Sequence, residues 1–261
     1  MGSVLDGLNA RIINRWLGQA CLNGLPFVAL LMVAHALGQG HAFDTRLLAH
    51  RADVLWASWH HTAAETAVLV TVILAVAAIA DLLAEALGAE VAAMWLGKPP
   101  WLLRVIRRQA PQRHRPEAAD AAGYRLQLTE TRVTNQYGLH LGIVWPRIWL
   151  LTTDTARGEV QKAWDGYQAA ATRFVWGLAC LAVGCVWWPA AVAGAAVAIS
   201  ARQRGRHDIR IFCELVESVV DTTVKRLAET VGIATPHGQV TQDLGPLMED
   251  VLAKGAAYPL P

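Results

Sequence analysis

Two stretches of this chain, each 28 residues long, contain no Asp, Glu, Lys or Arg. They run from Trp16 to Phe43 and from Phe174 to Ala201, and a third charge-free run of 15 residues extends from Thr66 to Ala80. A helix needs about 20 apolar residues to cross about 30 Å of hydrocarbon. Only 17% of the residues are charged, against about 25% in soluble domains, so we expect an integral membrane protein that is mostly α-helical.

The charge-free runs in the first 100 residues predict two full transmembrane helices. The first covers about residues 17–38. The second covers about residues 62–86 and continues as a stalk to residue 96, where Lys98-Pro99-Pro100 ends it because proline cannot continue a helix.

Basic residues near the membrane predict the orientation of these helices, since cytoplasmic loops carry an excess of Lys and Arg. The segment after the second helix is basic and includes Arg104, Arg107 and Arg108. We therefore expect this segment and the N-terminus to be cytoplasmic, and the loop at 39–64 to lie outside.

The run at 174–201 allows two interpretations. A single long helix, kinked at Pro189, would place one of its two flanking arginine clusters outside the cell. A short helical hairpin that bends at Trp187, Trp188 and Pro189 keeps both clusters inside, together with the C-terminus, and is the interpretation we favour. The cluster that follows the run contains Arg202, Arg204 and Arg206, and we expect these basic side chains to set the topology and to contact anionic lipid headgroups.

The segment between the membrane regions is expected to be a small α+β insert. Tyr124 to Glu130 alternates apolar and polar residues, which is typical of a strand, and Gly138 to Thr152 is interpreted as two further short strands broken at Pro146. Asp154 is expected to cap a helix that begins at about residue 155. Apolar spacing then predicts a helix from Ile209 to Val231 and a last short helix near the C-terminus.

These patterns divide the chain into four segments: an N-terminal membrane region at 1–97, a cytoplasmic linker and insert at 98–172, a membrane hairpin or kinked span at 173–202, and a helical cytoplasmic tail at 203–261. The location predicted is the cell membrane, with several passes and both termini in the cytoplasm.

The polar side chains predicted within the membrane are Asp81, Glu85 and His35. Asp81 and Glu85 are four residues apart, so they share one helix face. Carboxylates at membrane depth are costly and mark proton or ion pathways. The simpler interpretation, which we favour, places both carboxylates at the solvated inner interface.

Four histidines occur within 21 residues of the predicted outer loop, and His60 and His61 are followed by Glu65. Histidine and carboxylate side chains are zinc ligands. Their spacing matches no zinc motif, and HExxH is absent. We therefore favour hydrogen-bonded histidines at the interface, and expect no metal and no cofactor.

The sequence contains no P-loop, dinucleotide fingerprint, nucleophile elbow or kinase motif. A net charge of +2 does not indicate a nucleic-acid partner. The expected function is a non-enzymatic membrane scaffold that presents the insert and the tail to partner proteins, as a homo-oligomer or a subunit of a membrane complex. The alternatives are a small channel or transporter-like subunit that uses the membrane carboxylates, and a membrane-bound enzyme with an unrecognised site.

Overall fold

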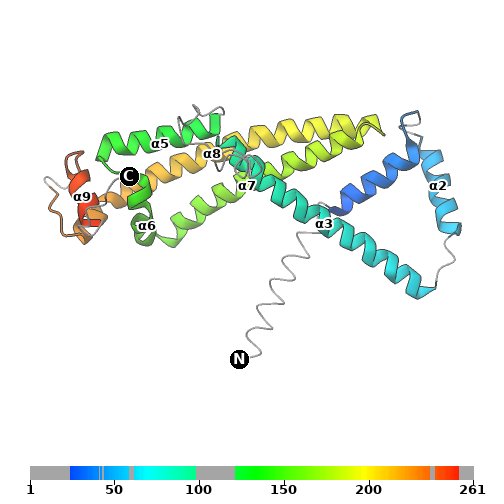
Figure 1. The fold of residues 1–261 in the computed structure, drawn as a ribbon, viewed down its shortest axis with the longest axis horizontal. Coiled ribbons are helices and arrows are strands. Elements are labelled where there is room, and N and C mark those ends of the chain that lie inside the picture. Colours follow the sequence, from blue (N-terminus) through cyan, green and yellow to red (C-terminus); the bar gives the residue numbers. More distant parts are fainter. Residues whose placement is uncertain are drawn as a thin grey trace, which may run out of the picture. The chain divides into compact units, whose positions relative to one another are not determined.

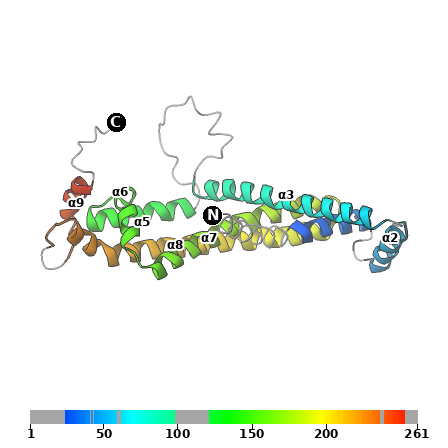
Figure 2. The same cartoon turned by 90° about the horizontal axis from the view of Figure 1, so that it is seen from below.

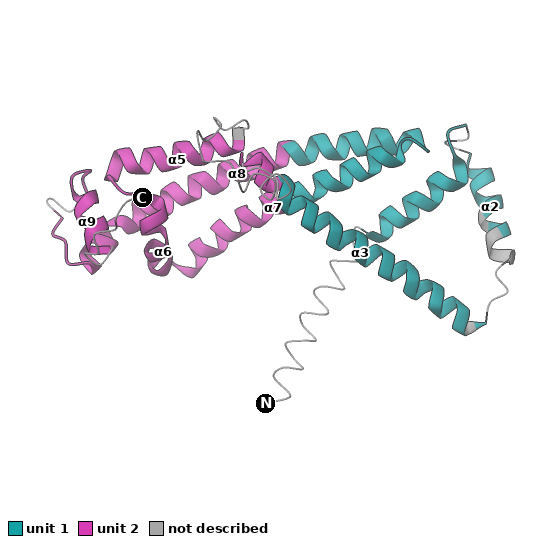
Figure 3. Ribbon diagram, in the orientation of Figure 1, with its two compact units in different colours: residues 1–91, 170–202 teal, residues 92–169, 203–261 magenta. Residues whose placement is uncertain are grey.

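The structure is a computed structural model that describes residues 24–40, 42, 44–58, 62–97, 121–235 and 239–252. All regular elements in these ranges are α-helices, so the described chain is mostly helical. The helices are Gly24–Leu37, α2 (Thr45–Ser58), α3 (Ala63–Trp95), α5 (Ala121–Tyr137), α6 (Leu141–Leu151), α7 (Asp154–Val183), α8 (Trp188–Thr230) and α9 (Leu244–Leu252). The chain forms two compact units, unit 1 (residues 1–91 and 170–202) and unit 2 (residues 92–169 and 203–261), shown in Figure 3.

The strand predicted at 124–130 is wrong, because these residues belong to α5. The described buried positions of α5 are Ala122, Gly123, Thr129, Val133 and Tyr137, and all but Gly123 follow one another at seven, four and four residues. This spacing marks one face of a helix. The apolar alternation misled the prediction because Tyr124 is exposed, whereas the polar Thr129 is buried.

The two strands predicted within 138–152 are also wrong, since residues 141–151 form α6. Val144 and Ile148 are fully buried and four residues apart, which places them on one helix face. Pro146 lies inside this short helix rather than interrupting a strand. The part of the insert that the structure describes is therefore helical, not α+β.

The long apolar helix α3 begins with a capping box. The Glu65 carboxylate accepts the backbone N–H of Thr62 at 3.0 Å, and the Thr62 hydroxyl accepts the N–H of Glu65 at 3.4 Å. Within the described residues, the segment Ala64–Trp95 is the one helix long and apolar enough to cross a membrane. For the first predicted transmembrane helix, the described part is Gly24–Leu37, and residues 17–23 lie outside the described ranges.

The chain reverses direction between α7 and α8. Helix α7 ends at Val183, a turn occupies residues 184–186, and α8 starts at Trp188 with Pro189 in its first turn. The two helices lie side by side in both views of Figures 1 and 2. A helical hairpin is therefore formed, but its turn lies just before the predicted bend: of the three residues predicted there, Trp188 and Pro189 belong to the first turn of α8. Helix α8 then runs on without interruption to Thr230 instead of ending near Arg202.

Small residues allow the hairpin arms of unit 1 to pack closely. A methyl group added to Gly194 would lie 2.6 Å from the backbone nitrogen of Leu181, and one added to Gly177 would lie 2.7 Å from the backbone nitrogen of Ala198. The same holds for α3, where a methyl group on Gly88 would lie 2.9 Å from the Cα atom of Thr172 in α7. Backbones approach in this way where small residues face each other.

The interior of unit 1 is made mostly of small residues, and the large apolar residues of α3 face outward. The buried positions of α3 in unit 1 are Ala77, Asp81, Ala84 and Gly88, which recur at helical spacing. The large side chains of α3 are exposed around the helix; they include Val68, Val70, Val72, Leu74, Val76, Ile79, Leu82, Leu83 and Leu87. This distribution is the reverse of that in a water-soluble domain.

Unit 2 buries its large apolar side chains, as is usual in water-soluble domains. Its core is formed by the buried faces of α5, α6, α7, α8 and α9. Large side chains such as Leu139, Ile148, Ile209 and Met248 are fully buried there. Helix α9 is attached to α6 by the Arg147 guanidinium, which donates to the carbonyl oxygen of Leu252 at 3.0 Å.

Side-chain caps define two further helix starts. The Asp44 carboxylate accepts the backbone N–H groups of Arg46 and Leu47, at 3.1 and 3.0 Å, at the start of α2. Asp154 does not cap α7 as predicted. The residue before it, Thr153, provides the hydroxyl that accepts the N–H of Ala156 at 3.4 Å.

Candidate functional site

Asp81 and Glu85, the two carboxylates predicted within the membrane region, have different surroundings. Asp81 is buried in unit 1, and its Oδ2 atom accepts the backbone N–H of Gly24 at 3.2 Å. Glu85 is exposed one turn later, and His35 is exposed on the helix Gly24–Leu37. Asp81 therefore joins α3 to the segment at Gly24, and the structure shows no contact between Asp81 and His35.

The histidines considered, but not favoured, as zinc ligands fall largely outside the described residues, since His41, His60 and His61 are not described. His50 is exposed on α2. Glu65 belongs to the capping box of α3. Among the described residues, no group of three or more histidine, cysteine or acidic side chains is arranged to hold a metal ion.

The predicted basic residues are described only in part. Arg104, Arg107 and Arg108 lie outside the described ranges. Arg202, Arg204 and Arg206 all lie on α8, where Arg204 is 3.8 Å from the carboxylate of Asp208, four residues later. The Trp187 ring at the hairpin bend donates from Nε1 to the carbonyl oxygen of Ala42 at 3.1 Å, so this side chain fixes the bend within unit 1.

An open aromatic groove in unit 2 was not anticipated from the sequence. It has a volume of about 470 Å³ and lies between α6, α7 and α8. We call it the aromatic groove; its lining residues are Trp145, Pro146, Trp149, Val160, Gln161, Trp164 and Phe212.

Ring contacts and one arginine hold the walls of the aromatic groove. The ring centroids of Trp145 and Trp149 are 5.6 Å apart, and those of Trp164 and Phe212 are 5.3 Å apart. Arg157 of α7 donates to the carbonyl oxygen of Trp149 at 2.9 Å, which links the end of α6 to the start of α7. These ring contacts and the hydrogen bond of Arg157 support the walls of the groove, while its lining is almost entirely apolar.

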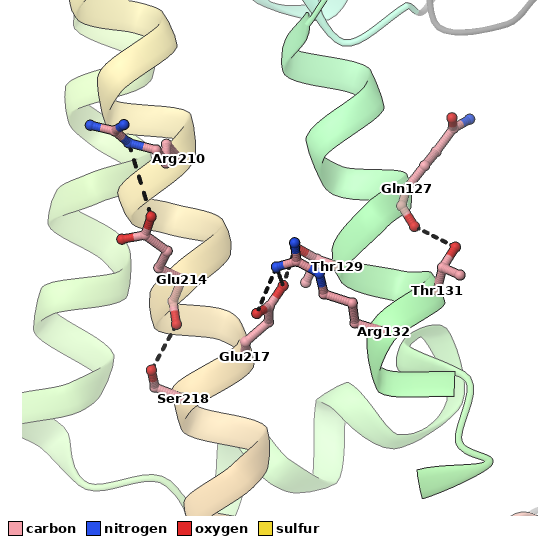
Figure 4. Close-up of polar contacts among 8 residues, drawn as sticks. All are labelled: Gln127, Thr129, Thr131, Arg132, Arg210, Glu214, Glu217 and Ser218. Atoms are coloured by element: carbon pink, nitrogen blue, oxygen red, sulfur yellow. Dashed lines mark hydrogen bonds and ion pairs between the residues drawn. The ribbon is translucent and has the colours of Figure 1, made fainter. Parts of the chain in front are cut away.

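A polar seam joins α5 to α8 (Figure 4). The Glu217 carboxylate accepts hydrogen bonds from the Thr129 hydroxyl at 3.0 Å and the Arg132 guanidinium at 3.3 Å. The Tyr137 hydroxyl donates to Asp221 at 2.8 Å. Burial, and then the neighbouring Asp221 carboxylate, raise the pKa of Tyr137 to about 12. This seam fixes the register of two helices and is structural in character.

The aromatic groove could have been found from sequence with a helical interpretation of residues 141–151. Trp145 and Trp149 are four residues apart, as are Val160 and Trp164, and each pair shares a helix face. The groove was not predicted because the strand interpretation of residues 138–152 did not use the four-residue spacing of Trp145 and Trp149.

Comparisons with known proteins add no assignment: no family model, no curated protein and no solved structure matches this chain.

Proposed function

We propose that the protein is a non-enzymatic integral membrane scaffold whose unit 2 binds partner proteins. The observation that carries the proposal is the contrast between the two units. Unit 1 exposes large apolar side chains and buries small ones, as a body surrounded by lipid does. Unit 2 buries its large apolar side chains, as a body surrounded by water does.

The proposed topology follows from the helices of unit 1. In this topology the predicted helix at about residues 17–38 crosses the membrane outward, α3 crosses it back to the cytoplasm, and the hairpin of α7 and α8 returns the chain to the side from which it entered. With both basic clusters in the cytoplasm, the N- and C-termini are cytoplasmic as well. The protein is then a multi-pass protein of the cell membrane, with unit 2 in the cytoplasm.

The aromatic groove is the proposed docking surface, and its occupant is an amphipathic helix of a partner protein. The pairs Trp145–Trp149 and Val160–Trp164 present side chains at a four-residue spacing along two walls. A helix carrying apolar residues three and four positions apart matches this spacing. Tryptophan is enriched among residues that dominate binding energy at interfaces.

A photo-crosslinker at Gln161, the polar residue in the lining, tests this docking surface in native membranes. The matched control places the same crosslinker at Glu159, which is exposed on α7 outside the groove. Mass spectrometry of the crosslinked peptide identifies the occupant. We expect a peptide from another protein whose sequence forms an amphipathic helix, captured from Gln161 and not from Glu159.

Binding of the identified peptide to the purified full chain then completes the test. The variant Trp149→Ala should abolish binding, as should Gln161→Trp, which fills the groove without removing a packed side chain. Leu150→Ala should not change binding, because Leu150 is exposed on the same helix outside the groove. Crosslinks only to lipid or to a second copy of this chain would overturn the assignment of a partner helix.

A second candidate function, a small channel or transporter-like subunit, is supported by the buried Asp81 carboxylate in the long apolar helix. Proteoliposomes distinguish the two candidates. A channel subunit would carry a proton or ion flux that Asp81→Asn and Glu85→Gln remove, whereas the scaffold would show no such flux in any variant.

A further inference from the structure

A second cavity of unit 2 is lined by cationic side chains. It has a volume of about 390 Å³ and lies between α5 and α8. We call it the basic pocket; its lining residues are Ala122, Arg125, Gln203, Arg206, His207, Ile209 and Arg210.

Three arginines from two helices line the basic pocket. Arg206 and Arg210 are four residues apart on α8 and share one face, and Arg125 faces them from α5. No acidic residue is among the described residues that line it. Two carboxylates of α8 pair with arginines of the same helix: Glu214 is 4.0 Å from Arg210, and Asp208 is 3.8 Å from Arg204, which does not line the pocket.

His207 adds a further donor to the pocket. Its Nδ1 atom lies 3.2 Å from the Arg210 guanidinium. Because a guanidinium only donates hydrogen bonds, Nδ1 accepts and the ring proton resides on Nε2. With the Gln203 amide, the pocket therefore offers hydrogen-bond donors of several kinds and a net positive charge.

We propose that the basic pocket binds the phosphate group of an anionic ligand. A phosphate monoester carries several acceptor oxygens and close to two negative charges, and arginine forks bind such oxygens in pairs. The volume lies within the range of small-ligand sites and exceeds what a lone phosphate fills. Arg206 follows Ala201, the last residue of the apolar run, by five positions. A lipid with a phosphorylated headgroup and a water-soluble phosphate compound are the two sources of this chemistry.

Binding to the purified full chain in detergent tests the proposal with two probes. The first probe is inorganic phosphate, measured by calorimetry. The second is a fluorescent short-chain phosphatidic acid, compared with the matching phosphatidylcholine. Arg125→Gln and Arg206→Gln should each weaken binding roughly tenfold or more, because each removes charged hydrogen bonds.

The control variant is Arg226→Gln, an exposed arginine on the same helix that does not line the pocket. It should change the affinity less than twofold. Phosphate binding that depends on Arg125 and Arg206 assigns a soluble ligand, and phosphatidic acid binding with the same dependence assigns a lipid; either outcome supports the site. The proposal is overturned if neither probe binds, or if Arg226→Gln weakens binding as much as the pocket variants do.

Discussion

Replacing Ile148 by alanine should destabilise unit 2 strongly, whereas the same change at Leu150 should not. Ile148 is fully buried in the core of unit 2, and Leu150 is 76% exposed on the same helix. Two residues that are two positions apart lie on one face of a strand but on different faces of a helix. The pair therefore tests the helical structure of α6 directly.

The expected loss in the free energy of unfolding follows from the number of buried carbons that Ile148→Ala removes. Ile148→Ala removes three carbons at about 0.8 kcal/mol each, or about 2.4 kcal/mol, and the cavity left behind brings the cost into the range of about 2–5 kcal/mol. At about 2–4 °C per kcal/mol, the midpoint of thermal unfolding should fall by roughly 4–20 °C. Leu150→Ala should change the free energy of unfolding by no more than about 0.5 kcal/mol.

Differential scanning fluorimetry of the full chain in detergent measures both variants against the parent protein. A large fall for Ile148→Ala and almost none for Leu150→Ala is expected. Equal losses for the two variants, as a strand buried on one face would give, would refute the helical account of this segment.

Three further predictions concern other contacts of the two units. In the hairpin, Gly194→Ala should lower the free energy of unfolding by about 1–3 kcal/mol, because its methyl group meets backbone atoms of the other arm. In the control variant Gly158→Ala, the methyl group meets no atom within 4 Å, so the midpoint of a thermal melt should stay the same or rise. In the polar seam, the pKa of Tyr137 is raised to about 12 from 10.0, so its contribution to stability should be present below pH 10 and lost as the pH rises through 12. Absorbance titrations of the parent chain and of Tyr137→Phe should differ by one tyrosine that ionises late. A difference between the two titrations already at pH 10 would contradict this prediction. In unit 1, Asp81→Ala leaves the N–H of Gly24 without its acceptor and should lower the midpoint of thermal unfolding. Asp81→Asn retains a carbonyl oxygen and should restore the midpoint of the parent protein. Equal midpoints for the two variants would count against the hydrogen bond between Asp81 and Gly24.

The helical hairpin was accessible from the sequence because its determinants are local. The hairpin is indicated by a proline that suits the start of a helix, which Pro189 occupies in α8, and by the basic clusters on either side. The long helix α3 was accessible for the same reason, since a continuous apolar stretch needs no knowledge of its neighbours.

The errors in the insert arise because short alternating patterns do not determine burial. In α5, the burial of the polar Thr129 hydroxyl is compensated by its hydrogen bond to Glu217, which is 88 residues away in the sequence. No pattern within residues 124–130 contains this information. The basic pocket was missed for a related reason, because it combines side chains from α5 and α8, which are distant in the sequence. The aromatic groove was missed because residues 141–151 were interpreted as strands.

Accessibility of single cysteines to a membrane-impermeant maleimide in intact cells tests the central claim most directly. With the four native cysteines replaced, Thr62→Cys at the start of α3 should be labelled in intact cells. Glu130→Cys on α5 should be labelled only after permeabilisation, and Val76→Cys on the exposed apolar surface of α3 should remain unlabelled. Labelling of Thr62→Cys and Glu130→Cys from the same side, or rapid labelling of Val76→Cys, would contradict a membrane scaffold with unit 2 in the cytoplasm.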